Sequence, residues 1–328
     1  MALIHPKVSV VIPVFNRAVA VRRAIESVLS QTCQNFEIIV VDDGSTDASA
    51  ASLAEIADRR IRVIRHDRNR GGSAARNTGI QSSSALYIAF LDSDDEWLPT
   101  KLERQLEVFA RSGERLALVY TGSEWVYPDG TVIVRTPCDR PALSLDLLTE
   151  NVVGETSVGM VRRAALDAVG GFDETLPSCQ DMDLWLRIAQ RFDVGIVAEP
   201  LVRVTKGEQD DRITNNVRSA LEGRALFCQK HRQELVRRRV LFLYLRKSGW
   251  WEHRRVRDIS AARRFYRESV EANRFAPVTY VLLLSTYVPM RWLDALARYK
   301  QALFAVFHWS PGGYPAGDSY PPSSTSTQ

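Results

Sequence analysis

The sequence contains little cysteine, and its four cysteines form no recognisable pattern. Cys33, Cys138, Cys179 and Cys228 show neither the close pairing of a zinc site nor the spacing of a disulfide framework. Scattered thiols of this kind are typical of proteins in a reducing compartment. The first residues also lack the basic and then apolar pattern of a signal peptide. We therefore expect reduced thiols and a cytoplasmic protein.

Long hydrophobic runs are missing too. The apolar segment 278–288 has 11 residues between Pro277 and Pro289, whereas a helix that crosses a membrane needs about 20 apolar residues. This segment is therefore either a buried core helix or a helix that lies in a membrane interface. The sequence leaves both interpretations open.

Familiar nucleotide-binding signatures are also absent. The chain has no G-x-G-x-x-G and no G-x-x-x-x-G-K-[ST] motif, so neither a dinucleotide fold nor a P-loop is indicated. Zinc-finger spacing and a module of interleaved aromatic and basic residues are missing as well, so we expect no nucleic-acid partner.

The charges that are present divide the chain into two unlike parts. Residues 1–205 carry 22 Lys/Arg and 28 Asp/Glu, a balance of −6, whereas residues 206–328 carry 21 and 11, a balance of +10. Basic clusters in the second part surround Trp250 and Trp251, which suits the headgroup region of a membrane. We expect a peripheral protein that binds an anionic membrane surface on the inner face of the cell membrane without crossing it. The alternative is that these helices only buttress the first part.

The first 100 residues alternate between strand and helix patterns. Predicted strands begin at residues 8, 36, 61 and 85, and predicted helices begin near residues 18, 46 and 71. This alternation indicates βαβ units and an α/β fold, with a mostly parallel, Rossmann-like sheet flanked by helices. After residue 205 the pattern becomes helical, with helices expected at 215–247 and 259–274.

Carboxylates gather directly after the fourth predicted strand. Asp92, Asp94, Asp95 and Glu96 follow that strand within five positions, at the edge where open α/β sheets hold their ligands. Like charges this close repel one another, and a hard cation such as Mg²⁺ or Mn²⁺ relieves the repulsion. Alternatively, the turn is a solvated cap for the next helix, because aspartate is a preferred N-cap residue.

Two more motifs point to a nucleotide. Asp43 and Gly44 follow the second strand, where the carboxylate can accept a hydrogen bond from a base N–H and the glycine allows close backbone approach. An Asx turn would give the same pattern. Arg76 and Asn77 lie in a glycine-led helix start, where they could meet a pyrophosphate or simply face solvent.

A third acidic motif lies further along the chain. Asp181 and Asp183 fall in the first turn of a helix expected from Gln180, where the helix dipole stabilises carboxylates. They are either site residues or ordinary helix-start acids.

Together these motifs resemble those of the family 2 glycosyltransferases, which have the GT-A fold. The similarity covers roughly residues 6–205 and includes six motifs in the family's order and spacing. The motifs are Val10–Asn16, Val41–Asp47, Gly71–Gly79, Leu91–Asp95, Gly170–Glu174 and Gln180–Trp185.

The resemblance implies a role for each matching residue on the donor side. Pro13 and Phe15 would line the nucleotide base, and Asp43 would bond its N–H edge. Asp92 and Asp94 match the family's D-x-D pair, with Asp94 as the direct ligand of Mg²⁺ or Mn²⁺ and Asp92 at the metal and nearer the ribose.

Asp181 matches the family's general base and would take the proton of the acceptor hydroxyl. One base and one displacement would invert the anomeric configuration. The resemblance thus implies metal-dependent transfer from a nucleoside-diphosphate sugar, of the UDP type, to a hydroxyl of a glycan or lipid-linked acceptor. Surface polysaccharide or lipopolysaccharide synthesis is the expected setting.

The chain departs from the family at the last strand. Many relatives have a metal-binding histidine there, whereas this chain has Lys206 after Thr205, so the lysine or water would take its place. This departure keeps open a non-catalytic nucleotide-sugar or glycan-binding module, and a sugar nucleotidyltransferase is a second alternative because such enzymes share the sheet and its acids. We expect a catalytic domain at 1–210, a basic helical region at 211–310 and a disordered tail at 311–328.

Overall fold

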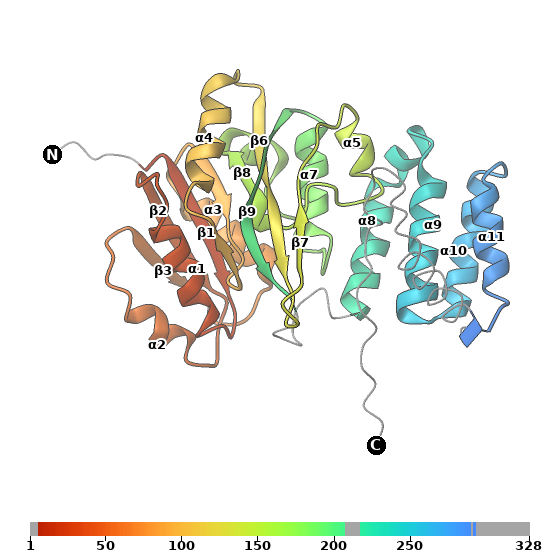
Figure 1. Cartoon of the computed structure of the whole chain (residues 1–328), viewed down its shortest axis with the longest axis horizontal. Coiled ribbons are helices and arrows are strands. Elements are labelled where there is room, and N and C mark those ends of the chain that lie inside the picture. Colours follow the sequence, from red (N-terminus) through yellow and green to blue (C-terminus); the bar gives the residue numbers. More distant parts are fainter. Residues whose placement is uncertain (1–5, 207–216, 290, 293–328) are drawn as a thin grey trace.

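The computed structural model describes residues 6–206, 217–289 and 291–292. The described chain forms a sheet with helices packed on it, followed by a row of helices that leads away from the sheet (Figure 1). The expected boundary at residue 210 and the expected disordered tail at 311–328 lie outside the described residues.

The strands and helices have the following bounds. The strands are β1 (Val8–Val14), β2 (Phe36–Asp42), β3 (Ile61–Arg65), β4 (Tyr87–Phe90), β5 (Asp95–Trp97), β6 (Leu116–Val126), β7 (Val132–Arg135), β8 (Gly159–Arg162) and β9 (Asp193–Thr205). The helices are α1 (Ala20–Leu29), α2 (Ser49–Ala54), α3 (Gly72–Ser82), α4 (Lys101–Arg111), α5 (Leu143–Asp146), the 3₁₀ turn η1 (Thr156–Val158), α6 (Arg163–Val169), α7 (Gln180–Ala189), α8 (Val217–Arg237), α9 (Leu241–Trp251), the π turn η3 (Glu252–Val256), α10 (Ile259–Ala272) and α11 (Pro277–Ser285).

The sheet has a parallel half and a mixed half. Strands β3, β2, β1 and β4 are neighbours in that order and run parallel, as the alternation of strands and helices predicts. Beyond β4 the order continues with β8, β6, β9 and β5, and of these neighbours only β6 and β9 are parallel. The expected mostly parallel sheet is therefore correct for the βαβ part and too simple for the rest, where three of the four neighbouring pairs from β4 to β5 are antiparallel.

The order of the parallel strands determines where ligands can bind. The chain places β2 on one side of β1 and β4 on the other, so a crevice opens at the carboxyl ends of these strands. The motifs after β1, β2 and β4 all lie at this edge. The apolar residues Val21, Ala24, Ile25 and Val28 of α1 are fully buried and form its inner face.

The first C-terminal helix belongs to the same hydrophobic core as the sheet. Phe227 and Leu235 of α8 are fully buried in the same apolar cluster as the sheet residues. Gly223 faces the loop before α7 so closely that a Cβ atom there would lie 2.7 Å from the Ser178 carbonyl oxygen. The expected buttress therefore exists in α8, which lies beside α7 in Figure 1.

The prediction of one helix over 215–247 is wrong, because the chain breaks after α8. Arg239 has a left-handed backbone with φ of 58°. Its N–H bonds the Val236 carbonyl at 2.9 Å, and the Val240 N–H bonds the Leu235 carbonyl at 2.9 Å, which is a Schellman cap. The sequence hides this cap because an arginine stands where glycine is usual.

The apolar segment near the C-terminus forms α11, and the buried-core interpretation of it is wrong. Val281 and Leu284 are 65% and 67% exposed. Within the described ranges, none of the helices combines the length and the apolar character that a bilayer crossing needs.

The left-handed cap gives a stability prediction. Arg239→Gly should raise the free energy of unfolding by about 0.5–1 kcal/mol, because glycine adopts positive φ without the steric cost that a side chain meets. The matched control is Gln233→Gly, an exposed position inside α8, which should lower it by about 0.5–1 kcal/mol. Urea titrations that show both variants shifted in the same direction would contradict the cap.

Candidate active site

Three aspartates lie between the end of β4 and the start of β5, and the Ser157 hydroxyl joins two of them. This hydroxyl accepts a hydrogen bond from the Asp92 N–H at 3.0 Å and donates one to the Asp95 carboxylate at 2.6 Å. Asp95 is buried, whereas Asp92 and Asp94 are partly exposed. Asp95 therefore builds the turn, and Asp92 and Asp94 are the carboxylates that a ligand can reach.

Negative charges are crowded at this turn. Burial raises the pKa of Asp95 well above its ordinary value, and repulsion from Asp94 and Asp92 adds to the shift, while the hydrogen bond from Ser157 opposes it. A cation bound beside these groups would lower their mutual repulsion.

Asp92 is held by a buried arginine. Its Oδ1 accepts hydrogen bonds from the Arg76 guanidinium of α3 and from the Thr156 hydroxyl, the latter at 2.9 Å. Arg76 is 8% exposed, and its guanidinium also lies over the Phe172 ring. The arginine predicted to meet a pyrophosphate is thus at the D-x-D pair, bound to the first aspartate, and its contact with a phosphate stays a prediction.

Asp43 anchors a loop at the end of β2. One oxygen contacts the His66 ring at 2.7 Å and accepts the Arg70 N–H at 2.9 Å, and the other accepts the Gly71 N–H at 2.8 Å. The carboxylate is buried among these donors. The structure therefore gives Asp43 a loop-holding role that the sequence analysis missed, and its contact with a base stays a prediction.

The segment after β2 packs closely on the segment after β3. Gly44 has φ of 76°, and a Cβ there would lie 2.6 Å from the Arg68 carbonyl carbon. The close approach at this glycine is to the protein's own backbone, and the predicted approach to a nucleotide stays a prediction. At the end of β1, Pro13 is partly exposed and Phe15 is 38% exposed. Both border the crevice, and their predicted contact with a base is untested.

Asn77 points to the protein rather than to the crevice. Its amide nitrogen donates to the Phe172 carbonyl at 2.9 Å and to Glu174 at 2.8 Å, and its amide oxygen accepts the Phe172 N–H at 2.9 Å. These bonds fasten α3 to the turn at 170–174. Because they use both ends of the amide, nothing in this geometry supports the predicted pyrophosphate contact of Asn77.

Asp181 has the environment of a proton acceptor. It lies at the start of α7, where its carboxylate accepts the Met182 N–H at 2.7 Å and the Asn151 amide at 2.9 Å. Burial raises the pKa of Asp181 to about 6, the Met182 hydrogen bond opposes the shift, and the charge of Glu155 adds to it. Arg76 and Asp92 also act on this carboxylate, so Asp181 shares one electrostatic environment with the turn after β4.

Asp183 has the opposite environment although it is only two residues away. Its side chain is fully buried and contacts His231 at 2.8 Å, Lys230 at 2.8 Å and Arg187 at 2.7 Å. Burial alone would raise its pKa, but the His231 hydrogen bond and the Arg187 charge lower the pKa of Asp183 to about 2. Asp183 is therefore the anchor of α8, and it cannot easily take a proton.

Glu155 is a site residue that the sequence analysis missed. One carboxylate oxygen lies 3.5 Å from the Lys206 Nζ, which itself lies 3.7 Å from the centre of the Trp125 ring. The other oxygen is buried without a hydrogen-bond partner. Glu155 acts on both Asp95 and Asp181. It stands in a loop without a motif, so only the fold brings it to the site.

The carboxylates at this edge fit a metal site that substrate phosphates complete better than a site made of protein ligands alone. Among the residues that the structure describes, no group of three or more His, Cys, Asp or Glu side chains could hold a metal ion. Mg²⁺ is commonly held by one or two carboxylates together with substrate phosphates. Asp92 and Asp94, which are partly exposed at the carboxyl edge of the sheet, fit that arrangement.

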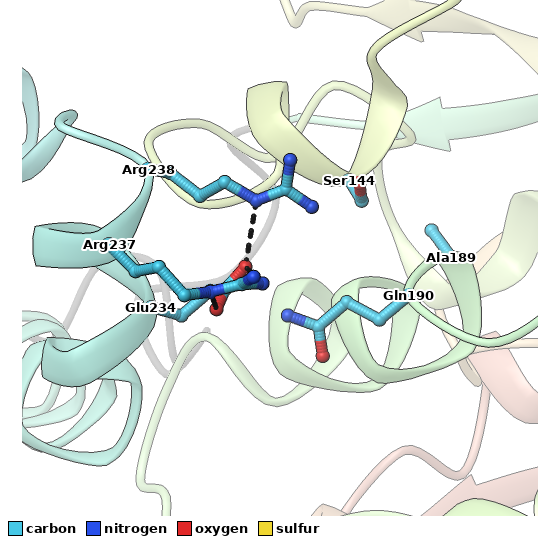
Figure 2. Close-up of a pocket in the computed structure, with 6 residues that line it drawn as sticks. All are labelled: Ser144, Ala189, Gln190, Glu234, Arg237 and Arg238. Carbon is cyan, nitrogen blue, oxygen red and sulfur yellow. Dashed lines mark hydrogen bonds and ion pairs between the residues drawn. The ribbon is translucent and has the colours of Figure 1, made fainter.

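A hollow of about 290 Å³ lies elsewhere, where α5, the end of α7 and α8 meet (Figure 2). Its arginines, Arg237 and Arg238, contact Glu234 at 2.6 and 2.9 Å. Their hydrogen bonds lower the pKa of Glu234 to about 2. The Glu234 carboxylate already pairs with both arginines, and no predicted site residue lines the hollow. We therefore assign no ligand to the hollow. The lining residues are Ser144, Ala189, Gln190, Glu234, Arg237 and Arg238.

Comparisons with known proteins agree with this geometry. The family described as "Glycosyl transferase family 2" has a model that matches residues 9–167. An uncharacterized glycosyltransferase of Rickettsia typhi is 30% identical over 227 residues, which cover 66% of this chain and 69% of the relative. The succinoglycan biosynthesis protein ExoO of Rhizobium meliloti is 44% identical over 113 residues, which cover 34% of this chain and 32% of the relative.

A solved structure shows the same fold. TarS of S. aureus, crystallised with UDP-GlcNAc, has a TM-score of 0.64 and 17% identity, over 85% of this chain and 84% of that chain. The fold is thus of the GT-A type with a helical C-terminal region. The chain spans only 28% to 33% of the length of three Rickettsia glycosyltransferases to which it is 33% to 36% identical.

The two aspartates of α7 give opposite stability predictions. The raised pKa of Asp181 means that its ionised form destabilises the folded state above about pH 6. Asp181→Asn should therefore raise the melting temperature at pH 8, with a gain that fades as the pH falls from 6 towards 4.

The lowered pKa of Asp183 means that its ionised form stabilises the fold above pH 3.8, and this stabilisation is lost as the pH falls towards 2. Asp183→Asn should lower the melting temperature at pH 8 and at pH 5.

Asp167→Asn is the matched control, because Asp167 is exposed on α6 and should change stability by less than about 0.5 kcal/mol. Calorimetric scans of the three variants at each pH provide the measurement. Equal destabilisation by Asp181→Asn and Asp183→Asn at pH 8 would refute the division of roles.

Proposed function

The chain belongs to the family 2 glycosyltransferases, and from this membership we propose that it transfers a sugar from a UDP-sugar to a hydroxyl group with inversion at the anomeric carbon. The acceptor in this proposal is a glycan or a lipid-linked glycan of a surface polysaccharide or lipopolysaccharide. Two relatives of this chain have names that refer to polysaccharide biosynthesis, ExoO and TuaG, which supports such an acceptor. The UDP-GlcNAc complex of TarS supports the donor class.

One observation carries the proposal. The pKa of Asp181 is raised to about 6, and Asp92 and Arg76 act electrostatically on the same carboxylate. A base with this pKa is largely deprotonated at neutral pH and still takes a proton readily, which is the range that general-base catalysis favours. The same neighbourhood holds the carboxylates of the D-x-D pair.

On the donor side, the proposal uses residues from three strand ends. Pro13 and Phe15 would line the base, and Asp43 would bond its N–H edge. Arg76, now paired with Asp92, would turn part of its guanidinium to the diphosphate, since guanidinium groups bind phosphate oxygens well.

A cation completes the donor site in this proposal. Asp94, together with Asp92, would hold Mg²⁺ or Mn²⁺, and the ion would neutralise charge that develops on the leaving diphosphate. Lys206, held by Glu155, would add positive charge beside the site in place of the histidine found in many relatives.

On the acceptor side, Asp181 would accept the hydroxyl proton while the acceptor oxygen bonds to the anomeric carbon. The bond from that carbon to the diphosphate breaks in the same step, and UDP leaves with the bonding electrons. Asn151 and the Met182 N–H hold the Asp181 carboxylate in place. Asp183 is paired with α8 and is not available as the base. One base and one displacement would invert the configuration.

Asp181→Asn should reduce transfer at least 100-fold, because an amide keeps the shape but cannot accept the proton. Donor affinity, measured by titration with UDP, should stay within about twofold of the wild type. Release of UDP from UDP-sugars with a soluble acceptor provides the measurement. If the variant kept more than about one-hundredth of the activity, the base would have to be reassigned, with Glu155 as the next candidate.

The pH dependence of the transfer rate should show whether Asp181 or Glu155 is the base. The wild-type rate should rise with pH and reach half its maximum near pH 6, where Asp181 loses its proton. Glu155→Gln removes a negative charge that raises this pKa, so the midpoint should move to lower pH with activity retained. The groups that also act on Asp181, namely Arg76, Asp92 and the Met182 N–H, remain in this variant. A midpoint that does not move would contradict the assignment.

Asp94→Ala should remove the dependence of UDP affinity on Mn²⁺. The reason is that the proposed metal site has only two protein carboxylates, so the loss of one leaves too few ligands. Asp95→Asn is the control, because Asp95 is buried against Ser157 and should keep the Mn²⁺ dependence. Calorimetric titration with UDP, with and without Mn²⁺, decides the matter. Equal Mn²⁺ dependence in Asp94→Ala and wild type would reject the metal site.

A further inference from the structure

Helix α11 has its apolar side outwards. Helix α11 turns Val278, Tyr280, Val281 and Leu284 to solvent, and the turn that continues it exposes Tyr287 and Val288. These six side chains are 37% to 67% exposed. On a helix these positions share one broad face. The most exposed of them, Val281 and Leu284, lie at its centre.

The two most deeply buried residues on the inner side of this segment are threonines, with Leu282 and Leu283 partly buried beside them. Thr279 and Thr286 are 0% and 2% exposed. The Arg263 guanidinium of α10 donates to the Thr286 hydroxyl at 3.0 Å and to its carbonyl at 2.9 Å, and the Thr279 hydroxyl lies 3.5 Å from that of Ser269. A helix packed on a protein core through threonines while valine and leucine face outwards is the reverse of the usual arrangement in water. An apolar medium outside would explain it.

Basic and aromatic residues stand at both ends of this face. Arg274 and Phe275 precede α11, and Phe275 is 94% exposed. Arg291 and Trp292 follow it, and Trp292 is 60% exposed. Aromatic side chains prefer the headgroup level of a membrane, and arginines pair with anionic lipids there. The pattern is that of a helix lying in the plane of an interface.

The position of α11 in the molecule allows such contact. In Figure 1, α10 and α11 form the end of the molecule opposite β3, while α8 joins the catalytic half. A surface at that end therefore leaves the carboxyl ends of the parallel strands uncovered. The part of the chain after residue 205 also carries the excess of positive charge.

We propose that the outer face of α11 (Val278, Tyr280, Val281, Leu284, Tyr287 and Val288) lies in the headgroup interface of an anionic lipid membrane. This proposal goes beyond the transfer reaction and does not depend on it. A second copy of the chain is a poorer occupant, because a twofold antiparallel contact would bring Arg274 of one copy to Arg291 of the other. Anionic lipid instead meets both arginines with opposite charge.

The test is co-sedimentation of the full-length protein with vesicles. Vesicles of phosphatidylcholine with 30% phosphatidylglycerol (about this fraction gives a clear negative surface charge) are compared with vesicles of phosphatidylcholine alone. The wild type should bind the anionic vesicles at least about tenfold more strongly, and binding should weaken with added salt. The double variant Val281→Asp/Leu284→Asp should lose at least about tenfold in binding.

Val134→Asp is the matched control, because Val134 is 54% exposed on β7 at the other part of the molecule and should bind vesicles as the wild type does. Since Val281 and Leu284 face outwards, the double variant should melt within about 2 °C of the wild type.

Three results would overturn the proposal. The first is no binding of the wild type to anionic vesicles, or equal binding to neutral ones. The second is a strongly lowered melting temperature in Val281→Asp/Leu284→Asp, which would mean that other parts of the chain cover this face. The third is a lipid-free dimer, seen by light scattering, that the same variant dissociates. None of these results depends on transfer activity, so the proposed function stands or falls separately.

Discussion

Repulsion between carboxylates is the constraint around which this molecule is built. Asp92, Asp94 and Asp95 share one short turn, and Glu155 and Asp181 act on the same region. The fold balances only part of this charge: Arg76 pairs with Asp92, Lys206 pairs with Glu155, and Ser157 donates to Asp95. Burial is the main cause that raises the pKa of Asp181, and the negative charges of Glu155 and Asp92 add to the shift.

The C-terminal helices take part in this arrangement through one buried ion cluster. His231 and Lys230 of α8 meet Asp183 of α7, one helical half-turn from Asp181. Unpaired, a buried carboxylate at Asp183 would cost several kcal/mol, and it would compete with Asp181 for the proton of an acceptor. The basic residues of this region therefore fall into two groups. One group pairs with acidic residues of the part that contains the sheet, and the other flanks the outward face of α11.

The parallel half of the fold could be predicted from the chain because its signals are local. The inner face of α1 follows from apolar spacing, and the acidic turns follow directly after β-branched runs, so their common edge follows from βαβ geometry. The mixed half could not be predicted in this way, since β8 and β5 are short and pair with strands far away in the sequence. The break at Arg239 was missed because its cap lacks the usual glycine.

The sequence by itself determined the family and the order of the motifs, and it predicted Asp92, Asp94 and Asp181 as candidate site residues, because each stands at a strand or helix end that short-range patterns mark. The tertiary structure alone decided what these groups touch. In the folded protein, Arg76 pairs with Asp92, and Asn77 bonds the turn at 170–174. Glu155 acts electrostatically on Asp181, and His231 contacts Asp183. The physical reason is that pKa values and ion pairs depend on burial and on distances between residues far apart in the chain, and no local pattern encodes them.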